Sequence, residues 1–301
     1  MAVVSGLLLG AALAAAGCGI GPGSDVGGVS LTVTRDYGAE PVQPPLEDEA
    51  TEADTVMRVL DRNAEISTRY GGGFVSSIDG LGEAVRNGDR FDWFFYMNGV
   101  EAPVGAADFP LRGGEAIWWD YHDWSAAERV PAVVGSWPRP LHGGYEGETH
   151  PVALVCMGGG PACGAVRRKL RQADITPVRD SPDDAIRVLV GPWARLREDP
   201  AAAQLEGGPQ VSGVFADFAN RQGGGYRLEG LDEGGEQVRR FGPGAGLVAT
   251  TRRYEAPPVW LVSGATARGA LAAAGLLDAA HLRDRYAVAT EGGRETPLPI
   301  R

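Results

Sequence analysis

One segment constrains the fold more than any other, because it carries large aromatic rings on both faces of a strand. The run Asp92-Trp-Phe-Phe-Tyr-Met-Asn-Gly-Val100 ends its aromatic part at Asn98-Gly99, the dipeptide most typical of a tight β-hairpin turn. Side chains alternate along a strand, so Trp93 and Phe95 face one side and Tyr96 faces the other. We predict a hairpin strand with one face in a core.

A second strand, predicted over residues 116–122, repeats this pattern. One face carries Ile117, Trp119 and Tyr121, and the other carries Trp118, Asp120 and His122. Rings beside polar groups are what a flat or saccharide-like ligand stacks on. The candidate ligand-binding residues are therefore Trp93, Phe95, Tyr96, Asn98, Trp118, Trp119, Tyr121 and His122. The alternative is that aromatic rings pack on both faces, partly against a second domain, because aromatic side chains usually bury.

The length of 301 residues predicts two domains, at about 100 to 200 residues each. We expect an α+β protein in which a small α+β domain over residues 29–124 is followed by an α/β domain over residues 151–301. Residues 125–150 carry several prolines and glycines and are predicted to connect the two domains.

In the first domain the patterns predict a solvated loop over 38–54, a helix over 55–64 behind Asp54 as N-cap, and strands over 29–35, 66–70, 74–78, 91–97 and 116–122. In the second domain they predict a helix over 165–173, an antiparallel hairpin insertion of 226–232 with 237–241, and strands over 152–156, 186–191, 211–215, 259–263 and 286–289.

The N-terminus has the features of an exported protein. Residues 2–16 contain no charge and are apolar or small, a run too short for a membrane span but typical of a signal peptide core. Ala15-Ala16-Gly17-Cys18 resembles the bacterial lipoprotein lipobox. We predict a signal peptide over 1–17, lipidation of Cys18 that anchors the chain to the membrane, and a flexible tether over 18–28. The alternatives are a buried N-terminal helix and a cleaved signal without lipid.

The remaining cysteines, Cys156 and Cys163, form an even pair. In an oxidising compartment such a pair is expected to form a disulfide. A redox pair usually reads C-x-x-C and a zinc site needs further ligands, so the disulfide is the better interpretation. Together with the N-terminus it predicts the extracytoplasmic face of a bacterial cell membrane.

The charge and the motifs exclude several function classes. The net charge of −11 repels a phosphate backbone, so nucleic acid is not expected as a partner. The sequence contains no G-x-S-x-G motif and its four histidines are scattered, so we assign no catalytic residue and no cofactor. Asp120, His122 and Asp123 are potential metal ligands, but a solvated strand end is the better interpretation and no metal site is assigned.

The first domain resembles the transcobalamin and intrinsic-factor C-terminal domain family. The resemblance covers about residues 29–124 and is carried by Gly73-Phe-Val-Ser-Ser-Ile-Asp-Gly80, the aromatic strand with Asn98-Gly99, Val104-Gly-Ala-Ala-Asp-Phe109, Leu111 and Gly113-Gly-Glu-Ala-Ile-Trp-Trp119. It implies a small β-grasp-like fold with one helix on a mixed sheet. In the vertebrate carriers this domain covers one face of a corrinoid, and the helical barrel that covers the other face has no counterpart here.

These expectations favour a membrane-anchored, extracytoplasmic lipoprotein that binds a small molecule without catalysis, with a corrinoid as the named candidate. The alternative is a structural or adhesive surface module that binds an envelope protein or a polysaccharide. An enzyme would require acidic and histidine side chains that converge between the domains.

Overall fold

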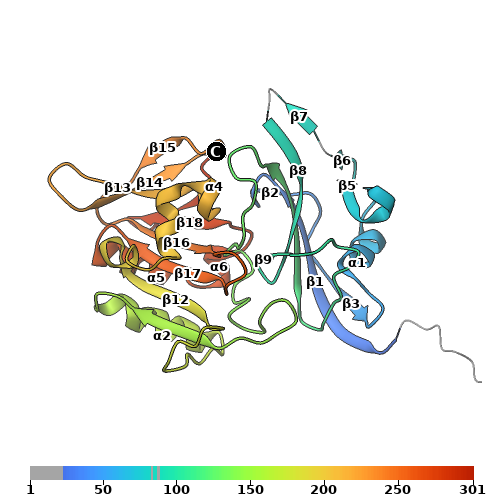
Figure 1. Ribbon diagram of the computed structural model, residues 1–301, viewed down its shortest axis with the longest axis horizontal. Helices are drawn as coiled ribbons and strands as arrows, with labels where there is room; N and C mark the ends of the chain where they lie inside the picture. Colours follow the sequence, from blue (N-terminus) through green and yellow to red (C-terminus); the bar gives the residue numbers. More distant parts are fainter. Residues whose placement is uncertain (1–22, 83, 87–88) are drawn as a thin grey trace, which may run out of the picture.

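The computed structural model describes residues 23–82, 84–86 and 89–301. Two halves, each built on its own β-sheet, lie side by side in it (Figure 1). The first half contains the predicted aromatic strands, and its sheet stands between α1 on one side and the second half on the other.

The first sheet is mixed, with β10 (Ala116–Asp123) near its middle. β10 runs parallel to β1 (Asp25–Arg35) and antiparallel to β8 (Asp89–Met97). The other strands are β2 (Glu40–Pro41) and β3 (Leu46–Thr51), which pair with β1, and β7 (Ala84–Arg86) and β9 (Val100–Glu101), which pair with β8. Both neighbours of β10 are long strands, so both of its hydrogen-bonding edges are filled.

One face of this sheet is covered by α1 (Val56–Asn63). The N-cap is Thr55, whose hydroxyl accepts the Arg58 backbone N–H, one residue after the predicted Asp54. The helix buries Val56, Val59 and Leu60 against the sheet. A small sheet of β4 (Ile66–Arg69), β5 (Phe74–Ile78) and β6 (Leu81–Gly82), with a short 3-10 turn over Tyr70–Gly72, completes this side.

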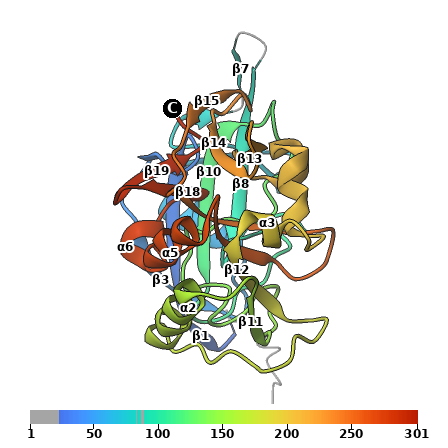
Figure 2. The same cartoon turned by 90° about the vertical axis from the view of Figure 1, so that its left-hand side faces the viewer.

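The second half is built on a six-stranded mixed sheet. Its order is β11 (Val152–Cys156), β12 (Ile186–Pro192), β17 (Val259–Gly264), β16 (Gly246–Thr251), β18 (Ala287–Glu291) and β19 (Arg294–Leu298). The first three strands are parallel and the others join in antiparallel pairs. Figure 2 shows the side of the second half on which α2 (Pro161–Gln172), α5 (Ala267–Gly275) and the short α6 (Ala279–Leu282) lie.

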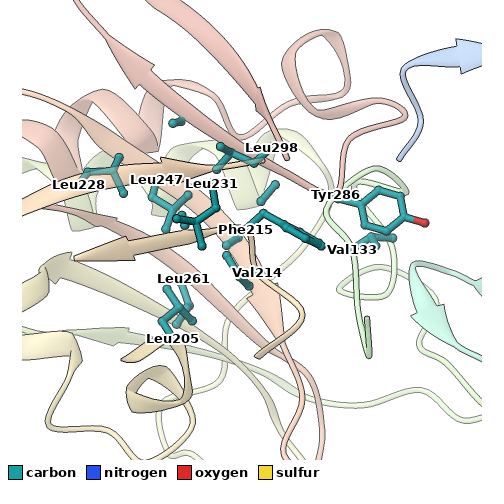
Figure 3. Packing of buried hydrophobic residues seen from close by; sticks show 14 of the residues in the cluster. Val133, Leu205, Val214, Phe215, Leu228, Leu231, Leu247, Leu261, Tyr286 and Leu298 are labelled. Carbon is teal, nitrogen blue, oxygen red and sulfur yellow. The ribbon is translucent and has the colours of Figure 1, made fainter. Parts of the chain in front are cut away.

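The opposite face of that sheet packs on a separate layer. It consists of α3 (Trp193–Leu196), a 3-10 segment over Ala202–Gly207, α4 (Pro209–Ser212) and the meander β13 (Ala216–Asn220), β14 (Tyr226–Leu231) and β15 (Gln237–Arg240). Leucine side chains from both layers meet around Phe215 (Figure 3). Tyr286 lies at the edge of this core, and its hydroxyl points away from the leucines.

Two predicted elements differ from the structure. Residues 211–215 were expected as a strand, but Pro209 begins the short helix α4 and Gly213, at φ +71°, ends it. The loop expected over 38–54 contains β2 and β3, because hydrogen bonds to β1 hold an acidic segment of low strand propensity in an extended conformation.

The segments outside the predicted domains are also more ordered than expected. β1 already begins at Asp25, so part of the tether predicted over 18–28 is a strand. The connection over 125–150 is not a loose linker, since Val130, Val133, Val134 and Trp137 are buried in the core.

The α+β fold class with antiparallel hairpins is confirmed. The hairpin of β14 and β15 is present, and Asn98 and Gly99, both at positive φ, form the predicted turn between β8 and β9. Within the part of the chain that the structure describes, no helix is long and apolar enough to cross a membrane.

Candidate functional site

The two faces of β10 belong to different parts of the molecule. Trp119 and Tyr121 point toward α1, together with Trp93 and Phe95 of the adjacent β8. Phe95 stacks on Trp119 with a centroid distance of 4.8 Å, and the Trp93 indole N–H and the Tyr121 hydroxyl donate to the Leu81 and Gly82 carbonyls. These four rings form the core of the first half.

The opposite face of β10 meets the second half through a cluster of five residues, which we call the interface cluster: Thr34, Tyr37, Asp120, His122 and Tyr286. The Asp120 carboxylate is at its centre. It accepts the Thr34 hydroxyl at 2.5 Å and the Tyr286 hydroxyl at 3.2 Å, and lies 2.8 Å from His122 Nδ1. Tyr286 comes from the loop before β18, so its hydrogen bond joins the two halves.

The turn after β1 supplies two further donors to Asp120. Asp36 and Tyr37 adopt φ near +58°, a conformation that L-residues other than glycine seldom adopt. The turn directs the backbone N–H groups of Tyr37 and Gly38 at the Asp120 carboxylate, at 3.0 and 2.8 Å. Hydrogen bonds to a charged acceptor stabilise this unusual backbone conformation.

Aromatic rings seal the interface cluster. His122 is stacked between Tyr37 and Phe94, at centroid distances of 4.4 and 4.5 Å, and Phe215 of the second half packs on Tyr37. Burial raises the pKa values of Tyr37 and Tyr286 well above their usual range, and the Asp120 charge raises them further.

Asp120 and His122 are 0% and 2% exposed. The solvated strand end expected for these residues is therefore wrong, because the second half covers them. In this sealed arrangement the pair joins the halves and is closed to a substrate. Among the described residues no group of three or more His, Cys, Asp or Glu side chains is placed to hold a metal ion.

Asn98 also has a structural position. It is 1% exposed, its amide donates to the Gly144 carbonyl at 2.9 Å, and its side-chain oxygen accepts the Ala116 N–H at 2.9 Å. The residue thus connects the β8–β9 turn to the start of β10 and to the connection between the halves.

The same face of the sheet opens at its other end into a cleft of about 370 Å³ between the two halves. We call this space the interdomain cleft. Ser30 and Thr32 line it because the even positions of β1 face the second half, while Val29, Leu31 and Val33 are buried toward α1. Trp118 and Trp137 contribute apolar surface.

The inner end of the cleft depends on a close approach at Trp118. Its indole N–H donates to the Thr34 hydroxyl at 2.7 Å, which links the cleft to the interface cluster. A Cβ at Gly135 would lie 2.5 Å from the Trp118 ring and 2.8 Å from the Arg285 backbone nitrogen. Glycine at position 135 therefore lets the connection pack against both halves.

The charged groups of the cleft come from three parts of the chain. Arg139 belongs to the connection, Glu47 to β3, and Arg283 and Asp284 to the loop after α6. Arg283 and Glu47 are exposed, whereas Arg139 and Asp284 are half-buried. Burial raises the pKa of Asp284 and lowers that of Arg139. A small polar ligand in the cleft would find hydroxyl, carboxylate and guanidinium groups together with indole surface.

The rings thus pack on both faces of the strands, partly against the second half, which is the alternative that the sequence left open. Of the eight candidate residues, Phe95 is half-buried and the others are at most 5% exposed. Trp118 alone of the eight lines the interdomain cleft; a ligand-binding role for the others stays a prediction. The residues that sequence reasoning missed are Ser30, Thr32, Arg139 and Arg283. The alternation of polar and apolar residues along residues 29–34 was the available signal for the first two.

The cysteine predictions fall on two parts of the chain. Cys156 and Cys163 are paired as a disulfide across the turn from β11 to α2, with Cα atoms 5.8 Å apart. Cys18 lies outside the described residues, as does the segment predicted to be the signal peptide.

Comparisons with known proteins match part of the chain. Residues 53–123 match a family model described as a domain of unknown function (DUF4430). A candidate metal-binding protein from Ruminococcus gnavus ATCC 29149 aligns at 17% identity and a TM-score of 0.25, over 32% of this chain and 97% of that chain. No curated protein matches the sequence. Neither match names transcobalamin or a corrinoid, so that resemblance stays a prediction.

Proposed function

We propose that this protein is an extracytoplasmic, lipid-anchored binding protein that holds a small polar molecule in the interdomain cleft without catalysing a reaction on it. The observation that carries the proposal is the cleft itself, which combines indole surface with hydroxyl and charged side chains from both halves. Pockets of this mixed chemistry are typical of small-molecule sites.

The size of the cleft favours a small ligand. A volume of about 370 Å³ lies near the lower end of the roughly 300 to 1,000 Å³ that ligand pockets span. A corrinoid, the class implied by the resemblance of the first half, would be enclosed only in part. We therefore propose a compact polar metabolite, and not a corrinoid, as the first candidate ligand of the cleft.

Two features support the proposed location. Residues 2–16 have the composition of a signal peptide core and end at the lipobox-like Cys18. The Cys156–Cys163 disulfide is of a kind that persists in oxidising compartments. An anchor at Cys18 would hold the cleft at the extracytoplasmic face of the cell membrane.

Binding is tested with the full chain in mild detergent. We would screen sugars, amino acids, carboxylates, phosphorylated metabolites, cobalamin and cobinamide by ligand-observed NMR. The variant Thr32→Trp fills the cleft, and Thr68→Trp, on the exposed face of β4, is its matched control. A ligand that binds the parent chain and Thr68→Trp but not Thr32→Trp supports the proposal.

A panel that yields no ligand sensitive to Thr32→Trp would contradict small-molecule binding and favour the surface-module alternative. Anchoring is tested separately in a bacterial host fed radiolabelled palmitate. The parent chain should incorporate the label and sediment with membranes, and Cys18→Ala should do neither. Equal labelling of both chains would refute lipidation at Cys18.

A further inference from the structure

Arg139 is an unusual cation for a protein of net charge −11. The residue is half-buried and lines the interdomain cleft. Nη1 donates to the His142 carbonyl at 3.3 Å, and within the described chain no carboxylate pairs with it. A partly buried charge without an ion pair carries a desolvation cost that a bound counter-ion would offset.

The backbone around Arg139 leaves room for the guanidinium. A Cβ at Gly114 would lie 3.1 Å from Nη2, and a Cβ at Gly143 would collide with Nη1. Both glycines have positive φ, +78° and +91°. The turn before β10 and the connection thus lie close to the guanidinium on two sides.

Among the described residues, no acidic side chain lies within ion-pair distance of Arg139. Glu115 raises the pKa of Arg139 electrostatically, yet burial has the larger effect and lowers it. The Glu115 carboxylate accepts the Arg112 backbone N–H at 2.9 Å instead, and burial raises its own pKa. Burial also raises the pKa of Asp284, while Glu47 is exposed.

The other polar groups of the cleft suit an anion as well. Arg283 lines it from the second half and forms no ion pair with any described residue, and Ser30, Thr32 and Ser136 line it from the first half and the connection. A guanidinium binds carboxylate and phosphate oxygens through two parallel N–H donors, and hydroxyl groups can donate to the remaining oxygens.

We propose that Arg139 is the specificity-determining residue of the interdomain cleft and that it pairs with a carboxylate or phosphate group of the bound molecule. This inference rests on the proposed function and names its ligand class: a small organic anion with a polar body. Arg283 adds a second positive charge to the lining of the cleft.

The test uses isothermal titration calorimetry on the full chain with three probes: citrate, glucose 6-phosphate and neutral glucose. We expect at least one anion to bind and glucose to bind more weakly. Arg139→Met should weaken the anion about tenfold or more, as for a lost hydrogen bond to a charged group. Arg168→Met removes an exposed arginine of α2 that has no ion pair among the described residues, and should leave binding unchanged. The anion that binds more tightly distinguishes a carboxylate from a phosphate ligand.

The outcomes separate this inference from the proposed function. Binding of glucose at least as tight as the anions, lost in Thr32→Trp but unchanged in Arg139→Met, overturns the anion inference and leaves the cleft as a binding site. Anion binding that is equal in Arg139→Met and Arg168→Met also overturns it. If no probe binds and the metabolite screen yields no ligand sensitive to Thr32→Trp, both fail. If Arg139→Met does not fold, Arg139→Lys replaces it, since lysine keeps the charge and loses the two parallel N–H donors. Anion binding as tight in Arg139→Lys as in the parent chain would overturn the inference that both donors bind the anion.

Discussion

The hydroxyl of Tyr286 is a single atom through which the second half donates to the buried Asp120 of the first. Tyr286→Phe removes this donor and keeps the ring, which packs edge-on against Tyr37, Trp118 and His122 at centroid distances of 5.0 to 5.5 Å. The same hydroxyl also lies 3.2 Å from His122 Nδ1, so the variant tests the contacts of one hydroxyl group between the halves.

The magnitude follows from what remains at Asp120. A hydrogen bond to a charged group contributes about 1.5 to 3 kcal/mol. Oδ1 keeps the Tyr37 N–H at 3.0 Å and its contact with His122 at 2.8 Å, so the carboxylate is not left without partners. We expect Tyr286→Phe to lower the free energy of unfolding by about 1.5 kcal/mol. Tyr286→Ala also removes a buried ring, and should lower it by about 4 kcal/mol or more.

Urea unfolding of the oxidised full chain, followed by tryptophan fluorescence and by circular dichroism, measures these values. The control is Tyr70→Phe, at a side chain that is 87% exposed, with an expected change within about 0.5 kcal/mol. Because buried residues of both halves share one core, the two probes should report one transition. A Tyr286→Phe variant as stable as Tyr70→Phe, or two separate transitions in the parent chain, would refute the reasoning.

Two further predictions concern the same contact between the halves. Burial raises the pKa values of Tyr37, Tyr96 and Tyr286. The free energy of unfolding is therefore unaffected by these groups below the ordinary tyrosine pKa of about 10, and it falls as the pH rises above that value, because the unfolded chain then loses protons that the folded chain keeps. For three groups the free energy of unfolding should fall by about 4 kcal/mol per pH unit. Urea titrations at increasing pH measure it, and tyrosinate absorbance from all eight tyrosines before unfolding would contradict it. Gly135→Ala should lower the free energy of unfolding by about 1 to 3 kcal/mol, because the new methyl group overpacks against the Trp118 ring. Gly275→Ala, in open space at the end of α5, should be neutral or stabilising by up to about 1 kcal/mol in the same assay, and equal effects of the two substitutions would count against close packing at position 135.

The local elements of the first half could be predicted from the sequence because short-range patterns determine them. The aromatic alternation gave β8 and β10 to within two residues, and Asn98-Gly99 gave the turn. β3 was missed because its stability comes from pairing with β1 and not from its own acidic residues. For residues 211–215, the flanking Pro209 and Gly213 outweighed an apolar run.

The site could be predicted only in part, because its partners are distant in the sequence. Trp118 and His122 were selected as an aromatic and polar face, which is correct as a pattern. What covers that face is Tyr286, more than 160 residues later, and no local pattern pairs such positions. Arg139 lay in a segment interpreted as a connection, where the pattern of prolines and glycines gives no sign of burial.

The position of β1 beside β10 limits how this protein can be divided. The segment that matches the family model, residues 53–123, begins after β1 and β3 have ended. A fragment cut at those bounds would leave the β1-facing edge of β10 without a hydrogen-bonding partner over six registered residue pairs. Such an open edge readily takes up a strand from another molecule, so self-association would be the expected behaviour of that fragment. Expression trials of the first half should therefore start no later than Asp25.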